Sequence, residues 1–120
     1  MSASHAPVLD AIAMQLVAAL DRYEGDVGTM LETWLDMERY RAVSAQVEEI
    51  RLYSATLPQV SVPWVELLIA HAELVHCLWR QQFDSPESHL AACSDLRARH
   101  GECIASMRAR CLGFVARSHA

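Results

Sequence analysis

The sequence contains neither lysine nor asparagine, although lysine is normally among the commonest residues. Both residues use AT-rich codons, so codon bias in a GC-rich bacterial genome explains their absence most simply. The lack of lysine excludes two kinds of chemistry. Neither a Schiff-base lysine nor a Walker-type phosphate loop, which ends in a lysine, is available to this chain.

Glycine and proline are also scarce, with four of each in 120 residues. They fall between the stretches with helical periodicity or near their ends, as is usual in helical proteins. The sequence has no glycine-rich loop for a phosphate and no motif that combines a nucleophile with a base. We therefore expect a protein without catalytic activity.

No C-x-x-C pair occurs, so neither a redox motif nor a standard zinc site is indicated. The apolar residues near the start follow no basic segment, which argues against a secretory signal and favours the cytoplasm. In that compartment cysteines are expected to be reduced thiols that pack as small hydrophobic residues. A Cys77–Cys93 disulfide is geometrically conceivable and less favoured there. The four cysteines are Cys77, Cys93, Cys103 and Cys111.

The net charge of -5 is unevenly distributed. Residues 61–95 carry five acidic residues and one arginine, whereas residues 96–120 carry one acidic residue and five arginines. An acidic chain lacks the basic footprint of a general nucleic-acid-binding protein. The basic last quarter could pair with an acidic partner or with the acidic second helix of the same fold, and we favour the second helix.

A content of 52 % hydrophobic and 21 % charged residues indicates one globular domain, residues 1–120. The most continuously apolar stretch, residues 61–83, predicts a helix in which Glu66, Glu73 and Arg80 form the one polar strip. A helix so apolar touches neighbours on most sides, so we expect it to be the central helix. Its charged residues and histidines argue against burial in a membrane.

Three further helices are predicted at residues 6 or 7 to 23, 27–57 and 86–117, the last one capped by Ser85. The apolar face of the second changes sides near residues 36–41. The helix either continues there or breaks near residues 38–42, and we prefer continuity because Asp36 and Arg39 form an i,i+3 pair. The fold class expected is all-α, an up-and-down four-helix bundle with long second and fourth helices.

A second helix with two apolar faces needs a second partner, and a homodimer would supply one. Gly101, Ala105, Ala109 and Gly113 also form a row that is a close packing seam, a dimer contact or an alanine-rich solvent face. We expect a protein-interaction module that acts as an adaptor, a chaperone-like protein or a regulator. The residues predicted for the contact surface are Tyr40, Val43, Val47, Ile50 and Tyr53.

His71 lies in the middle of the apolar face of the 61–83 helix. We expect a core histidine that bonds to a backbone carbonyl or a buried tyrosine, because buried polar groups find partners. The alternative is a cofactor site between the third and fourth helices. An antiparallel register predicts a metal site at His71, His100 and Cys103, or alternatively a haem with His71 and His100 as its axial ligands.

The same register brings a second set of metal-ligating side chains together nearer the connection between those two helices. We predict it as a further candidate metal cluster. Its members are His76, Cys77 and Cys93, with His89 nearby.

Overall fold

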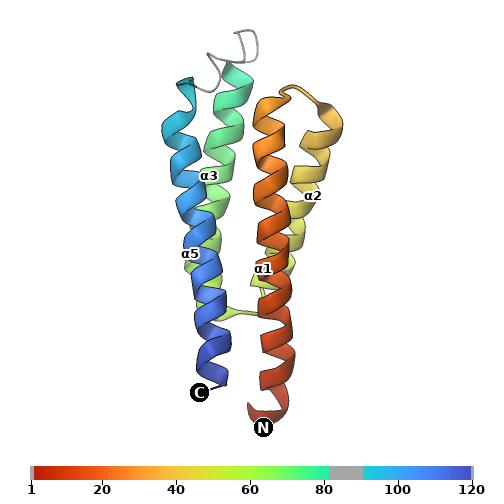
Figure 1. Cartoon of the computed structure of the whole chain (residues 1–120), viewed down its shortest axis with the longest axis vertical. Helices are drawn as coiled ribbons and strands as arrows, with labels where there is room; N and C mark the ends of the chain where they lie inside the picture. Colours follow the sequence, from red (N-terminus) through yellow and green to blue (C-terminus); the bar gives the residue numbers. More distant parts are fainter. Residues whose placement is uncertain (1, 82–90, 120) are drawn as a thin grey trace.

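The computed structural model describes residues 2–81 and 91–119, with side chains from residue 7 onward. In this part of the chain the helices run alternately up and down, and they form the bundle seen in Figure 1. They are α1 (Ser2–Glu32), α2 (Met37–Ser54), α3 (Ser61–Arg80) and α5 (Ser94–Ser118), with a 3-10 turn, η1 (Pro58–Val60), before α3. The prediction of an all-α four-helix bundle is confirmed.

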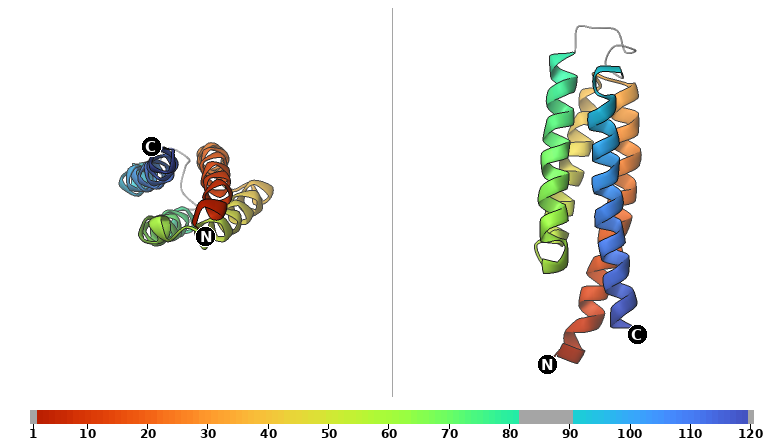
Figure 2. Two further views of the ribbon diagram at one scale, coloured as in Figure 1. Left: turned by 90° about the horizontal axis from the view of Figure 1, so that it is seen from below. Right: turned by 90° about the vertical axis from the view of Figure 1, so that its left-hand side faces the viewer.

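The bundle is elongated, with extents of 56 × 25 × 17 Å. The start of α1 and the end of α5 lie at the same end of the molecule (Figure 1). Seen along the bundle in Figure 2, α1 has α2 on one side and α5 on the other, whereas α3 packs mainly against α5. The prediction that the helix beginning at Ser61 is central is therefore wrong, because α3 packs mainly on one neighbour, whereas α1 and α5 each pack on two.

Each helix turns one row of apolar side chains inward, as amphipathic packing requires. On α1 this row continues without interruption past Gly25 and Gly28 to the last turn. Its buried members are Ala13, Leu16, Ala19, Leu20, Tyr23, Val27, Met30 and Leu31. They pack against Val43 and Ile50 of α2, Leu67, Leu74 and Leu78 of α3, and Ile104, Met107 and Cys111 of α5.

The predicted continuous helix over residues 27–57 is wrong, because the chain breaks between Glu32 and Met37. Asp36 is the N-cap of α2, and its Oδ1 accepts hydrogen bonds from the backbone N–H groups of Glu38 and Arg39 at 3.0 and 3.3 Å. The alternative break near residues 38–42 lies just beyond the observed one. The two apolar faces thus belong to two helices that pack on each other.

This break also changes the helix lengths. The first helix is the longest, with 31 residues, and α2 has only 18, so the predicted long second helix is wrong. α5 is long, as expected, with 25 residues. The predicted cap Ser85, the start of that helix and the last residues of the 61–83 segment lie outside the described residues.

The basic charges of α5 pair within the chain, as predicted, but with α1 and α3 rather than α2. The Arg108 guanidinium lies 2.6 Å from a carboxylate oxygen of Asp21 and 3.1 Å from one of Glu24. Arg99 lies 3.8 Å from Glu73 on α3. These pairs are largely exposed, so each contributes little to stability.

Much of α3 is left uncovered by the rest of the chain. Within the described residues the segment Pro58–Arg80 is long and apolar enough, by length and composition alone, to span a membrane. Only 28 % of its most apolar window is buried. The helix carries ionisable side chains that are costly in lipid. In the described fold it packs on the side of a helical bundle.

Candidate functional site

The hydroxyl of Tyr23 sits in the core between two histidines from different helices. Its oxygen lies 2.6 Å from Nδ1 of His71 on α3 and 2.7 Å from Nε2 of His100 on α5. Tyr23 itself comes from α1 and is fully buried. The three side chains, here called the Tyr23 cluster, therefore connect three of the four helices through one oxygen atom.

A phenol has one proton, so Tyr23 donates to one imidazole and accepts an N–H from the other. Burial raises the pKa of Tyr23 far above its ordinary value and lowers the pKa of His71. Burial, the neighbouring His71 and then Arg97 lower the pKa of His100 to about 4. All three groups are therefore neutral at pH 7. Two proton arrangements are possible: either His71 donates to the Tyr23 oxygen and Tyr23 donates to His100, or His100 donates to Tyr23 and Tyr23 donates to His71. Both arrangements form both hydrogen bonds.

The prediction that His71 is a core histidine bonded to a buried tyrosine is confirmed. Of the alternative metal set, the structure brings His71 and His100 together, with ring centroids 6.4 Å apart. Cys103 is not part of that group, because its Sγ donates to the Glu66 carbonyl at 3.8 Å near the surface. Within the described residues no three His, Cys, Asp or Glu side chains could hold a metal ion.

The geometry of the Tyr23 cluster also bears on haem ligation. An iron bound by both imidazoles would stand between their two facing nitrogens, and the Tyr23 oxygen occupies that place. The residues as arranged do not fit an axial pair for haem. Tyr23 was not singled out from the sequence, although its place in the α1 apolar row indicates burial.

The second predicted metal cluster contains a disulfide. Cys77 and Cys93 form a disulfide between α3 and the start of α5, with Cα atoms 6.1 Å apart. The expectation of four reduced thiols is therefore wrong for this pair, while Cys103 and buried Cys111 are free. His76 is exposed on α3, and His89 lies outside the described residues.

The residues predicted as a second contact surface are packed inside the chain. Val43 and Ile50 are 1 % and 0 % exposed, and the other three are half-buried against the same core. Tyr40 makes edge-on contacts with Trp34 and Trp79, with centroids 6.0 and 5.9 Å apart. The α2 face was predicted to be free because the helix break was missed. The five residues are Tyr40, Val43, Val47, Ile50 and Tyr53.

A different row of apolar side chains is exposed, on the outer face of α3. Four of its five members are apolar, and they recur at alternating spacings of three and four residues, the heptad pattern of helix pairing. Val62, Val65 and Ile69 are 64 %, 50 % and 46 % exposed. We call this row the α3 seam, and its members are Val62, Val65, Ile69, Ala72 and His76.

The two edges of the α3 seam differ in chemistry. Glu66 and Glu73 border it on the side of α5, where Glu73 meets Arg99. Leu68, 41 % exposed, and half-buried Val75 border it on the other side. The seam was missed because a helix apolar on most sides does not reveal which side faces the core.

The row of small residues on α5 lies largely at the surface. Ala105 and Ala109 are exposed, and Gly101 and Gly113 are half-buried. A Cβ on Gly101 would meet nothing within 4 Å. The row is therefore not a close packing seam between helices of this chain.

Comparisons with protein-family models, with curated proteins and with solved structures found no match to this chain.

Proposed function

We propose that this protein is a non-catalytic interaction module that acts as a homodimer, joined through the α3 seams of two copies. The observation that carries the proposal is the exposure of Val62, Val65 and Ile69 along one line of α3. A helix that is apolar on most sides normally packs against neighbours on most sides. The single chain covers only one side of α3, so a second helix is needed to cover the other.

A second copy of α3 is the occupant that fits this seam best. In a parallel pair about a two-fold axis, each seam residue meets its own counterpart, and cyclic pairs of this kind are the commonest oligomers. Val62 and Ile69 occupy one of the two heptad core positions, where β-branched side chains are usual in parallel dimers. The apolar layers then match from Val62 to Ala72.

The charged edge of α3 supports the parallel arrangement. In a parallel pair, Glu66 and Glu73 of one copy lie beside the apolar edge of the other copy, which is formed by Leu68 and Val75. An antiparallel pair would instead bring the glutamates of both copies together, and like charges at that distance repel. Such a dimer leaves α1, α2 and most of α5 on the outside, where an adaptor or regulator has surface for further partners.

The test is the mass in solution of the full chain and of Ile69→Glu, measured by light scattering coupled to gel filtration. Wild type is expected at twice 13.4 kDa, and Ile69→Glu at 13.4 kDa. Leu112→Glu is the matched control, because Leu112 is 44 % exposed on α5 and lies outside the seam. A monomeric wild type, or a dimer that survives Ile69→Glu, would overturn the proposal.

A further inference from the structure

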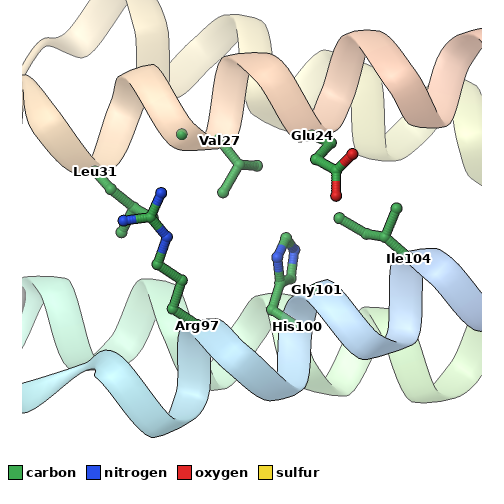
Figure 3. Close-up of a pocket in the computed structure, with 8 residues that line it drawn as sticks. Glu24, Val27, Leu31, Arg97, His100, Gly101 and Ile104 are labelled. Carbon is green, nitrogen blue, oxygen red and sulfur yellow. The ribbon is translucent and has the colours of Figure 1, made fainter.

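A pocket of about 130 Å³ opens between α1 and α5, beside the Tyr23 cluster. Its apolar wall is formed by Val27 and Leu31 of α1 and Ile104 of α5, and the His100 ring lies at its centre (Figure 3). The volume is close to that of a cavity of about 150 Å³ that holds benzene. It therefore suits a ligand of about six non-hydrogen atoms.

Two glycines, one on each helix, keep the pocket open. Gly28 and Gly101 both line it, and a Cβ on Gly101 would meet nothing within 4 Å. A Cβ on Gly28 would meet only the Arg97 guanidinium, at 4.0 Å. Glycine is unfavourable inside a helix by about 1 kcal/mol relative to alanine, so neither position is explained by helix stability.

The polar groups of the pocket place opposite charges at its two ends. Figure 3 shows the Arg97 guanidinium and the Glu24 carboxylate on opposite sides of His100. Glu24 accepts a hydrogen bond from Arg108 at 3.1 Å, but Arg108 also pairs with Asp21 at 2.6 Å, so one guanidinium is shared by two carboxylates and the Glu24 end of the pocket stays acidic. Arg97 makes no ion pair within the described residues, and Nδ1 of His100 makes no hydrogen bond there either. An anion is therefore accommodated at the Arg97 end of the pocket, where no ion pair among the described residues uses the guanidinium, and away from Glu24.

We propose that this pocket binds a short-chain monocarboxylate. The carboxylate lies between the Arg97 guanidinium and the Nδ1–H of His100, and the alkyl chain packs on Val27, Leu31 and Ile104. Arginine suits this task because its planar fork pairs with carboxylate oxygens. The pocket is separate from the α3 seam, so ligand binding does not depend on the proposed dimer.

Binding of a carboxylate also fixes the protons of the Tyr23 cluster. When Nδ1 of His100 carries the proton and donates to the ligand, Nε2 accepts from the Tyr23 hydroxyl. The Tyr23 oxygen then accepts from Nδ1–H of His71, at 2.6 Å. One of the two possible hydrogen-bond directions is selected, and the choice at the pocket is transmitted to α3.

The experiment is a titration of the full chain with sodium propionate, followed by nitrogen-detected NMR of the histidine rings. Saturable binding is expected with a Kd of about 1 mM, a usual affinity for so small a ligand. The His71 and His100 ring shifts should change together. Arg97→Gln is expected to weaken binding roughly tenfold or more, since a charge-assisted pair is lost.

Filling the pocket supplies a second, independent variant. Gly101→Leu places a side chain in the open space and should abolish binding while the fold is retained. Gly25→Leu is its matched control, because Gly25 is also a helical glycine with nothing within 4 Å and does not line the pocket. Propionamide, which has the same shape without the charge, should not bind.

Three results would contradict the carboxylate site. They are an absence of saturable shifts in the wild type, binding by Arg97→Gln equal to that of the wild type, and equal binding of propionamide and propionate. Binding that survives Gly101→Leu would place the ligand elsewhere on the chain. The mass of the protein in solution tests the seam separately.

Discussion

The Tyr23 oxygen lies 2.7 Å from Nε2 of His100, although 77 residues separate the two in the chain. The same oxygen holds His71, so one hydroxyl sets the register of α1 against both α3 and α5. Apolar burial is non-directional, whereas a buried imidazole needs a partner at one defined position and is costly without it. The Tyr23 cluster therefore selects one alignment of these helices.

Tyr23→Phe keeps the ring and removes the hydroxyl, which leaves nitrogens of His71 and His100 without partners. The free energy of unfolding is expected to fall by about 1–3 kcal/mol, the usual cost of an unsatisfied buried polar group. Urea unfolding followed by circular dichroism measures it. Tyr53→Phe is the control, since Tyr53 is only half-buried and lies outside the cluster. Equal losses in both variants would show that the Tyr23 hydroxyl has no special role.

The lowered pKa of His100 predicts how stability depends on pH. In the unfolded chain a histidine takes up its proton near pH 6.5, whereas in the fold burial and the neighbouring His71 and Arg97 lower this to about 4. Between these values the unfolded chain binds more protons, so stability is complete above pH 6.5 and is lost progressively as the pH falls to about 4. The difference corresponds to roughly 3 kcal/mol.

The measurement is the free energy of unfolding in urea at several values between pH 7 and pH 4. Carboxylates titrate in the same range, so the informative quantity is the difference between the wild type and His100→Gln. Glutamine can still bond to Tyr23 and takes up no proton. The variant should have a flatter profile below pH 6.5. If the wild type and His100→Gln had parallel pH profiles, His100 would take up its proton as readily in the folded chain as in the unfolded one, which would contradict the lowered pKa.

The sequence pattern was sufficient for the helical bundle, because strong periodicity survives in any tertiary context. The break before α2 was missed because Asp36 suits two roles. Asp36 and Arg39 read as an i,i+3 pair within one helix, yet Asp36 caps α2 and Arg39 pairs with Asp26 of α1 at 3.0 Å. Local sequence does not distinguish a cap from a pair when the competing partner lies in another helix.

The helix beginning at Ser61 was predicted to be central for a different reason. Its apolar residues surround most of the helix, so periodicity could not show that Leu67 and Leu74 face inward while Val65 and Ile69 face outward. The Tyr23 cluster was only partly foreseen. His71 was expected to find a buried partner, but the partner's identity depends on a register between helices that only tertiary packing fixes.

The Cys77–Cys93 disulfide predicts a defined thiol count. The oxidised protein should expose two alkylatable thiols after unfolding, Cys103 and Cys111, and four after reduction. Closing a segment of 16 residues by a covalent link stabilises a fold by roughly 3 kcal/mol, so reduction should lower the unfolding free energy by about this amount. The Cys77→Ser/Cys93→Ser variant should be insensitive to reductant. Four alkylated thiols without reduction would contradict the disulfide.

Ile50 lies on α2 and Ile69 on α3, and the structure predicts that replacing them lowers the unfolding free energy by very different amounts. Ile50 is fully buried in the core, so Ile50→Ala should lower the unfolding free energy by about 2–5 kcal/mol. Ile69 is 46 % exposed, so Ile69→Ala should change the stability of an isolated chain by much less. Urea unfolding at low protein concentration separates the chain's own stability from association. If Ile69→Ala were as costly there as Ile50→Ala, Ile69 would belong to the core of a single chain, and the α3 seam would not be free to meet a second copy.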